Sequence, residues 1–228
     1  MTDPIIQSYF QSDLIGKLIF IGLGLLSVLS WTLIFYRSRL LRQAQTQDLA
    51  FLSLLEQYPG KVLQLETSTG PACALYNIMR KHTIDILSKN RQFSASSGAL
   101  ASLSMNDIEM IYERSQAEQQ SQMHKLEESV HHLSTIVTLA PFLGLLGTVW
   151  GILISLSSLR SASSNEAVFV GLSMALATTV VGLIVAIPAL LGHNYLKAWL
   201  KEFDNRLSEV SSQILALIEI QYRRVDKE

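Results

Sequence analysis

Residues 140–152 read APFLGLLGTVWGI. The stretch is apolar enough for the interior of a membrane, yet it contains a proline, three glycines and a threonine. Glycines let a neighbouring backbone approach closely, and a threonine puts a hydroxyl among apolar neighbours. Pro141, like Pro188 later in the chain, is predicted to kink its helix, because a proline frees the backbone carbonyl one turn earlier. We interpret the stretch as the wall of a packed, polar-lined passage that the rest of the chain supports.

The composition is typical of a membrane protein. Of the 228 residues, 49% are hydrophobic and 16% are charged, and the formal net charge is -1 at pH 7. A soluble chain needs more charge to cover its surface, and a nucleic-acid-binding chain needs an excess of basic residues. Cys73, the one cysteine in the sequence, is predicted to be an inert buried thiol. No catalytic or metal-ligating constellation is visible, so we expect no enzymatic activity, no metal and no cofactor.

Three runs of the sequence are long and apolar enough to cross a membrane. They are residues 14–36, 133–159 and 167–192, and Lys17 is the single charged residue within them. A helix rises about 1.5 Å per residue, so each run covers the ~30 Å hydrocarbon core of a bilayer. Lys17 lies near the end of its run, where its ammonium group reaches the headgroups. The sequence therefore predicts three transmembrane helices.

Basic residues gather on one side of the predicted spans. Arg37, Arg39 and Arg42 follow the first span directly, whereas no lysine or arginine precedes it in residues 1–13. Lys197 follows the third span. The positive-inside rule then places the N-terminus outside and the C-terminus in the cytoplasm. The remaining predicted segments are an outer N-terminus at 1–13, a cytoplasmic helical region at 37–132, a short outer loop at 160–166 and a cytoplasmic helical tail at 193–228.

Helices are expected to continue beyond the membrane. Asn106 with Glu109 resembles a capping box, and the polar part that follows contains no proline, so residues 107–159 are predicted to form one helix. Shorter helices are predicted at 44–58 and 72–87. An apolar stripe after the third span needs a surface to cover it, either on the second long helix or on a neighbouring subunit. The stripe consists of Phe203, Leu207, Val210, Ile214, Leu217 and Ile218. The predicted fold class is an all-α, polytopic membrane protein in which helices two and three extend far into the cytoplasm.

Small and hydroxylated residues form a narrow stripe on each of the last two spans. Residues at i, i+4, i+7 and i+11 share one face of a helix. These positions are Gly144, Thr148, Gly151 and Ser155 on the second span, and Gly171, Ala175, Thr178 and Gly182 on the third, with Thr179 and Ala186 on the adjacent row. The stripes have two interpretations. Either they let membrane helices pack closely while the hydroxyls bond back to their own helices, or several helices bring them together around a narrow, wet pathway.

The three spans lack the acidic groups that a proton path requires. No aspartate or glutamate lies within them, and a proton path needs a titratable relay. Any titrating carboxylate must therefore come from a partner chain. His131, His132 and His193 lie near the inner ends of the spans, where we interpret them as solvated interfacial side chains.

Two stretches resemble signatures of a known family. Residues 140–152 are similar to the second-span signature of the TolQ/ExbB/MotA proton channel family, and residues 175–189, ALATTVVGLIVAIPA, are similar to its third-span signature. Three predicted spans with an outer N-terminus resemble TolQ and ExbB more than the four-span MotA. The sequence leaves open whether the chain belongs to a TolQ or an ExbB system.

The resemblance implies a fold, a location and partners. It implies a homopentameric ring in the bacterial inner membrane, with the outer segments in the periplasm. The ring encloses the membrane helices of a TolR- or ExbD-like protein, whose single membrane aspartate titrates, and a TonB- or TolA-like protein is a further partner. Proton flow then energises outer-membrane processes, either transport or envelope integrity.

The resemblance also implies roles for individual residues. Thr148 matches the second-span threonine of the family and Thr179 its third-span threonine, and both are expected to face the partner's aspartate. The predicted proton-pathway residues are Thr148, Thr179, Thr178, Ser155 and Met174. The predicted packing residues are Gly144, Gly147, Gly151, Gly171, Ala175 and Gly182.

Met174 departs from the family pattern. The family carries a glutamate eight residues before the third-span glycine, which is Gly182 here, and a methionine cannot titrate. This departure keeps a second hypothesis open, in which the chain is a non-conducting membrane scaffold of the same architecture that anchors a partner.

Overall fold

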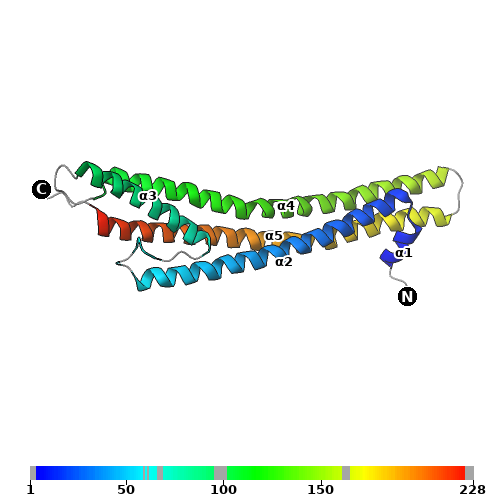
Figure 1. Cartoon of the computed structure of the whole chain (residues 1–228). Helices are drawn as coiled ribbons and strands as arrows, with labels where there is room; N and C mark the ends of the chain where they lie inside the picture. Colours follow the sequence, from blue (N-terminus) through cyan, green and yellow to red (C-terminus); the bar gives the residue numbers. More distant parts are fainter. Residues whose placement is uncertain are drawn as a thin grey trace. The chain divides into compact units, whose positions relative to one another are not determined.

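The computed structural model describes residues 4–58, 60, 62–65, 69–94, 102–160 and 165–223. Within these residues the fold is helical, apart from an isolated backbone bridge between Leu103 and Arg223. The helices are α1 (Pro4–Gln11), α2 (Leu14–Gln57), α3 (Pro71–Ser94), α4 (Met105–Arg160) and α5 (Asn165–Tyr222) (Figure 1). The predicted all-α fold class is confirmed.

Three of these helices, α2, α4 and α5, are long and apolar enough to cross a membrane. They contain the three predicted spans, so the prediction of three membrane-compatible helices is confirmed. The predicted outer loop at 160–166 and the predicted N-terminal segment at 1–13 lie partly outside the described residues. Residues 4–11 of that N-terminal segment form helix α1, which the sequence did not predict.

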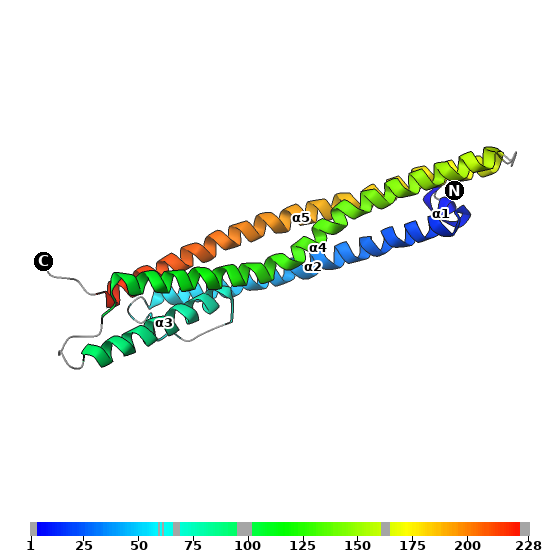
Figure 2. The ribbon, with the colours of Figure 1, turned by 90° about the horizontal axis from the view of Figure 1, so that it is seen from above.

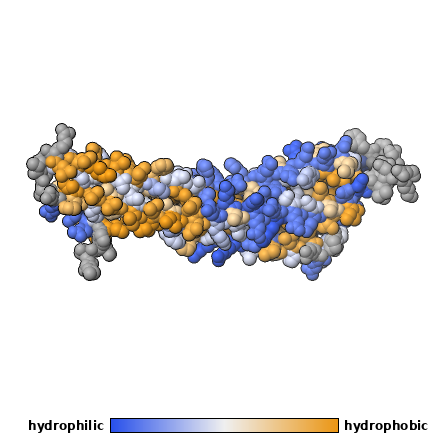
Figure 3. All heavy atoms as spheres, turned by 180° about the vertical axis from the view of Figure 1, so that it is seen from behind, coloured by the Kyte–Doolittle hydropathy of each residue, from blue (hydrophilic) through white to orange (hydrophobic). Residues whose placement is uncertain are grey.

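The chain divides into two compact units. The first contains Met1–Ser38 and Glu128–Lys197, and the second contains Arg39–Glu127 and Ala198–Glu228. On the face that Figure 3 shows, apolar side chains dominate the first unit and hydrophilic side chains cover much of the second. A soluble surface does not expose so much apolar area, so the first unit is the membrane-compatible part of the chain.

A small core joins the three long helices within the first unit. It consists of Ile19 and Leu23 of α2, Ala140 of α4, and Val185 and Ala186 of α5. Leu23 and Ala140 are fully buried. Because α4 and α5 also run side by side here (Figures 1 and 2), α2 packs against a pair of helices. Pro141 and Pro188 both lie inside helices that continue past them.

The apolar stripe at the end of α5 packs within the second unit. Its five most buried members, Phe203, Leu207, Val210, Ile214 and Ile218, are each at most 3% exposed. Two polar contacts tie this part of α5 to α4. The hydroxyls of Ser115 and Ser211 lie 2.9 Å apart, and the Gln119 amide donates to the Asp204 carboxylate at 2.8 Å. The stripe is therefore covered within its own chain, since α4 bonds to this part of α5 and Phe203, Leu207 and Val210 line a cleft with residues of α2.

The helix boundaries correct two predictions. The helix expected at 44–58 is the end of α2, which runs without interruption from Leu14 to Gln57. The capping box predicted at Asn106 and Glu109 is wrong, because α4 begins two residues earlier. Ser104 donates its backbone N–H to the Asp107 carboxylate at 2.9 Å, and the Asp107 N–H lies 3.3 Å from the Ser104 hydroxyl. The prediction that residues 107–159 form one helix is confirmed.

Candidate functional site

Small residues let α4 and α5 touch along their backbones. A methyl group built on Gly151 would lie 2.5 Å from the Gly171 carbonyl oxygen, and one built on Gly182 would lie 2.9 Å from the Ala140 carbonyl oxygen. Real Cβ atoms do not approach so closely. At this helix separation, therefore, only glycine fits at either position. We call this contact the α4–α5 seam. Its members are Gly144, Gly147 and Gly151 of α4, and Gly171, Ala175 and Gly182 of α5.

Two of the candidate hydroxyls lie inside the seam and are bonded to backbone. Thr178 is fully buried, and its hydroxyl donates to the carbonyl oxygens of Met174 at 3.0 Å and Ala175 at 2.9 Å. Ser155 is 7% exposed, and its hydroxyl lies 3.0 Å from the carbonyl oxygen of Gly151 and 3.0 Å from that of Val168 on the other helix. Both hydroxyls therefore satisfy backbone groups where the helices pack.

The other two threonines lie beside the seam. Thr148 is partly exposed, and its hydroxyl donates to the Leu145 carbonyl oxygen at 2.6 Å. Thr179 is also partly exposed, and its hydroxyl donates across the seam to the Gly144 carbonyl oxygen at 3.3 Å. On α4 the buried seam positions are Gly144, Gly147 and Gly151, so Thr148 lies one step around the helix from the contact at Gly147.

Helix α2 covers one side of the seam only. On α4, the indole N–H of Trp150 donates to the Asp13 carboxylate at 2.9 Å, just before α2 begins. On α5, the sulfur of Met174 would lie 2.7 Å from a methyl group built on Gly16 of α2. Each residue turns a helix by about 100°. Thr148 therefore lies about 200° around α4 from Trp150.

Thr179 has the corresponding position on α5. It lies about 140° around the helix from Met174, at about 100° per residue. The two threonines thus face the same side of the seam, away from α2. We call this side the threonine face. It carries partly exposed hydroxyls, whereas the opposite side is closed by α2.

Met174 lies under α2 and is 1% exposed. Its side chain end occupies the space that the missing Cβ of Gly16 leaves free. The structure therefore brings Thr148 and Thr179 together on one side of the seam, buries Thr178 and Ser155 within the seam, and places Met174 on the opposite side. The five predicted pathway residues do not share one face.

Asp13 is the polar residue of this unit that sequence reasoning missed. One carboxylate oxygen accepts the Gly16 backbone N–H at 3.0 Å and caps α2, while the other accepts the Trp150 indole N–H. An aspartate directly before an apolar helical run is a recognisable N-cap signal. Its second bond depends on which side of α4 is covered by α2, and the sequence does not contain that information.

The structure describes other titratable residues near the ends of the spans. His131 and His132 are exposed and His193 is partly exposed, in keeping with solvated side chains. Among the described residues there is no group of three or more histidine, cysteine, aspartate or glutamate side chains able to hold a metal ion. The site therefore consists of hydroxyl groups, backbone carbonyls and close helix contacts.

Comparison with known proteins places these features in a family. The model of the MotA/TolQ/ExbB proton channel family matches residues 84–209. The chain is 28% identical over 215 residues to the biopolymer transport protein ExbB of Salmonella typhimurium, covering 92% of this chain and 84% of the relative. It is 27% identical over 198 residues to the Tol-Pal system protein TolQ of Haemophilus influenzae, covering 82% of each chain.

A third relative is longer than this chain. The biopolymer transport protein ExbB of Pseudomonas putida is 26% identical over 212 residues, which are 92% of this chain but only 62% of that protein. The family model covers all of α4 and α5 as far as residue 209, which includes the whole seam.

Proposed function

Because the chain belongs to the MotA/TolQ/ExbB proton channel family, we propose that it is the channel or stator subunit of a proton-driven machine in the bacterial inner membrane. In this proposal the proton gradient energises outer-membrane processes, either transport or envelope integrity. The N-terminus lies in the periplasm, and the polar second unit lies in the cytoplasm. The relatives named ExbB and TolQ support the class of function, and the identity of the system is left open between them.

The observation that carries this proposal is the threonine face. It is the side of the α4–α5 seam that α2 leaves uncovered, and it presents Thr148 and Thr179 without any acidic group of its own. A single-span TolR- or ExbD-like partner with a membrane aspartate would complete it, because hydroxyls can hold water or accept a hydrogen bond from a protonated carboxyl group. Several copies of the chain, arranged as a homopentameric ring, would enclose such a partner. A TonB- or TolA-like protein would be a further partner of this assembly.

The seam residues have a supporting role in this proposal. Thr178 and Ser155 hold α4 and α5 at a fixed separation, and this fixes where Thr148 and Thr179 stand. Met174 fills the opposite side under α2. The second hypothesis, a non-conducting scaffold of the same architecture, is favoured by this methionine, because the family position that carries a glutamate is here apolar and covered.

The Thr148→Val substitution tests the proposal. Valine has nearly the shape of threonine but no hydroxyl, so assembly is retained while one hydrogen-bonding group leaves the threonine face. We expect proton flux to fall about three- to tenfold, which corresponds to the loss of one hydrogen bond of about 1 kcal/mol. The measurement is dye-monitored proton flux in liposomes that contain the chain and the TolR- or ExbD-like protein of its organism.

Thr32→Val is the matched control. Thr32 is an exposed threonine of α2 whose hydroxyl also donates to its own helix, at 2.8 Å from the Val28 carbonyl oxygen. It lies away from the threonine face, so its substitution should leave the flux unchanged. Full flux in Thr148→Val, with assembly intact, would contradict a role for this hydroxyl. Absence of partner-dependent flux in the wild-type chain would favour the scaffold.

A further inference from the structure

A buried carboxylate with a free oxygen lies in the second unit. Asp48 of α2 is 8% exposed, and its Oδ1 atom accepts the backbone N–H of Ala72 at 3.0 Å, which caps the start of α3 from a different helix. Gly70, just before α3, has a φ of 150° and leaves room for this contact. The other oxygen, Oδ2, is buried and has no hydrogen-bond partner among the residues that the structure describes.

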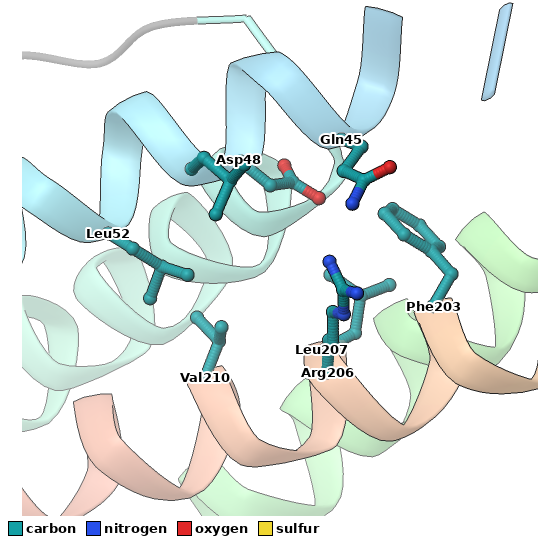
Figure 4. Close-up of a pocket in the computed structure, with 8 residues that line it drawn as sticks. Gln45, Asp48, Leu52, Phe203, Arg206, Leu207 and Val210 are labelled. Atoms are coloured by element: carbon teal, nitrogen blue, oxygen red, sulfur yellow. The ribbon is translucent and has the colours of Figure 1, made fainter. Parts of the chain in front are cut away.

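This carboxylate faces a small cleft between α2 and α5. The cleft has a volume of about 280 Å³, including the part that is open to solvent. Apolar side chains form most of its wall, and Asp48 and Arg206 are the charged residues that line it. Figure 4 shows the Asp48 carboxylate entering the cleft from α2 and the Arg206 guanidinium entering it from α5. The remaining lining residues are Gln45, Leu49, Leu52, Phe203, Leu207 and Val210.

Arg206 is engaged elsewhere, and only weakly. It forms an ion pair with Glu202, one turn earlier on α5, and the two side chains are 43% and 62% exposed. Exposed pairs of this kind contribute little, because water screens them and two long side chains must be held in place. A buried carboxylate that lacks a partner attracts a cation more strongly, since the surrounding dielectric is lower.

We propose that Asp48 and Arg206 form a switchable ion pair across this cleft, in which Arg206 exchanges between Glu202 on its own helix and the buried carboxylate of Asp48. With Arg206 on Asp48, the free Oδ2 oxygen gains a charged donor and α2 is clamped to α5. With Arg206 on Glu202, the clamp is open. This clamp is internal to the second unit and does not depend on proton transport by the first.

Protonation of Asp48 decides between the two positions. Burial raises the pKa of Asp48 from 3.8 to about 6 while Arg206 is on Glu202, although the hydrogen bond from Ala72 opposes this shift. Arg206, with Glu202 beside it, faces Asp48 from α5, and α3 contributes the backbone N–H of Ala72. Closing the clamp lowers the pKa again, because a guanidinium favours the charged carboxylate. The clamp is therefore closed near neutral pH, and it opens as the pH falls through the lowered pKa of the closed state, which lies below 6.

Thermal unfolding of the full chain in detergent tests the clamp, using Arg206→Gln alone and in a Glu202→Gln background at pH 5 and pH 7.5. We expect Arg206→Gln to lower the Tm at pH 7.5 by about 2–4 °C, the usual response of a domain of this size to a modest loss of stability. The same drop should persist in the Glu202→Gln background, because Asp48 remains. At pH 5 the drop should shrink, since a protonated Asp48 no longer holds Arg206.

Arg223→Gln is the matched control. Arg223 forms the same type of pair with Glu219 on α5 and does not line the cleft, so its effect should not change with pH. An Arg206→Gln effect that disappears in the Glu202→Gln background would overturn the clamp, because Glu202 would then be the sole partner. Equal drops at the two pH values, or the same pH dependence in Arg223→Gln, would also overturn it. In an Asp48→Asn background, Arg206→Gln should no longer lower the Tm. If Asp48→Asn does not fold, the Glu202→Gln background and the comparison between pH 5 and pH 7.5 still test the clamp.

Discussion

At the scale of single residues, the α4–α5 seam depends on the absence of side chains. Gly151 and Gly182 each face a carbonyl oxygen of the opposite helix, and Gly147 faces the Thr178 side chain. Because protein interiors are close-packed, an added methyl group must push the helices apart or force Thr178 out of place. These glycines therefore fix the helix separation and, with it, the position of the threonine face.

Gly147→Ala should destabilise the chain by about 1–3 kcal/mol, the usual cost of overpacking. The added Cβ would collide with the buried Thr178 side chain, which is held by two carbonyl oxygens. Thermal unfolding in detergent measures this loss. Gly24→Ala is the control, because Gly24 lies in α2 with no atom within 4 Å of its added Cβ. It should be neutral or stabilising by up to about 1 kcal/mol, from helix propensity. Equal losses in both variants would contradict the seam.

The sequence predicted which residues are small, but the structure was needed to show what they contact. Helical spacing assigned Gly144, Thr148 and Gly151 to one face, but the buried position between Gly144 and Gly151 is Gly147 and not Thr148. Gly147 and Thr148 are adjacent in the sequence, and either one fits a stripe of small residues on α4. Met174 and Thr179 lie close together in the sequence yet on opposite sides of α5, because α2 covers one side. No local pattern states which side a third helix will occupy.

At the scale of elements, the start of α4 depends on a side chain before the helix. Ser104 and Asp107 exchange backbone and side-chain hydrogen bonds at the first turn. Asp107 also accepts from the Asn90 amide of α3 at 3.4 Å. The cap thus fixes where α4 begins and ties it to the preceding helix.

Ser104→Ala should lower the free energy of unfolding by about 1 kcal/mol, the typical cost of losing a serine cap. Asn106→Ala is the control, because Asn106 is an exposed residue inside the helix, and this change should be nearly neutral. Hydrogen exchange of the first turn of α4 adds a local readout, with faster exchange expected in Ser104→Ala alone. A larger loss of stability in Asn106→Ala than in Ser104→Ala would instead support Asn106 as the N-cap of α4.

The long helices were largely predictable, because no proline or glycine pair interrupts the polar part of α4 or the tail of α5. The cap of α4 was not, since two overlapping patterns, Ser104 with Asp107 and Asn106 with Glu109, satisfy the same spacing rule. The sequence also did not predict that α2 continues past Arg37 to Gln57. Composition changes sharply there, but a change from apolar to polar residues does not end a helix.

At the scale of the whole molecule, the membrane-compatible part carries almost no titratable group. Within residues 14–36, 133–159 and 167–192, Lys17 is the single charged side chain, and Asp13 lies just outside and is bonded to Trp150. Transfer of protons through an apolar region needs an ionisable relay. Under the proposed function, the titrating group must therefore come from a partner chain.

Liposomes that contain the chain alone should hold an imposed pH gradient as well as empty liposomes do. Adding the TolR- or ExbD-like protein should allow the gradient to decay, and replacing that protein's membrane aspartate by asparagine should stop the decay. Dye-monitored pH measures all three arms. A gradient that decays with the chain alone would contradict the view that the titrating group comes from a partner.

The contact between Gly16 and Met174 also has a consequence for how such sequences evolve. The end of the Met174 side chain fills the space left by a missing side chain on α2, so the sizes of the two residues are coupled. A larger residue at position 16 would require a shorter one at position 174, and a charged residue at 174 would require a polar neighbour beneath α2. The two positions should therefore covary among close relatives, and a Met174→Glu substitution alone would test how the side chain fits against Gly16 as much as its ability to titrate.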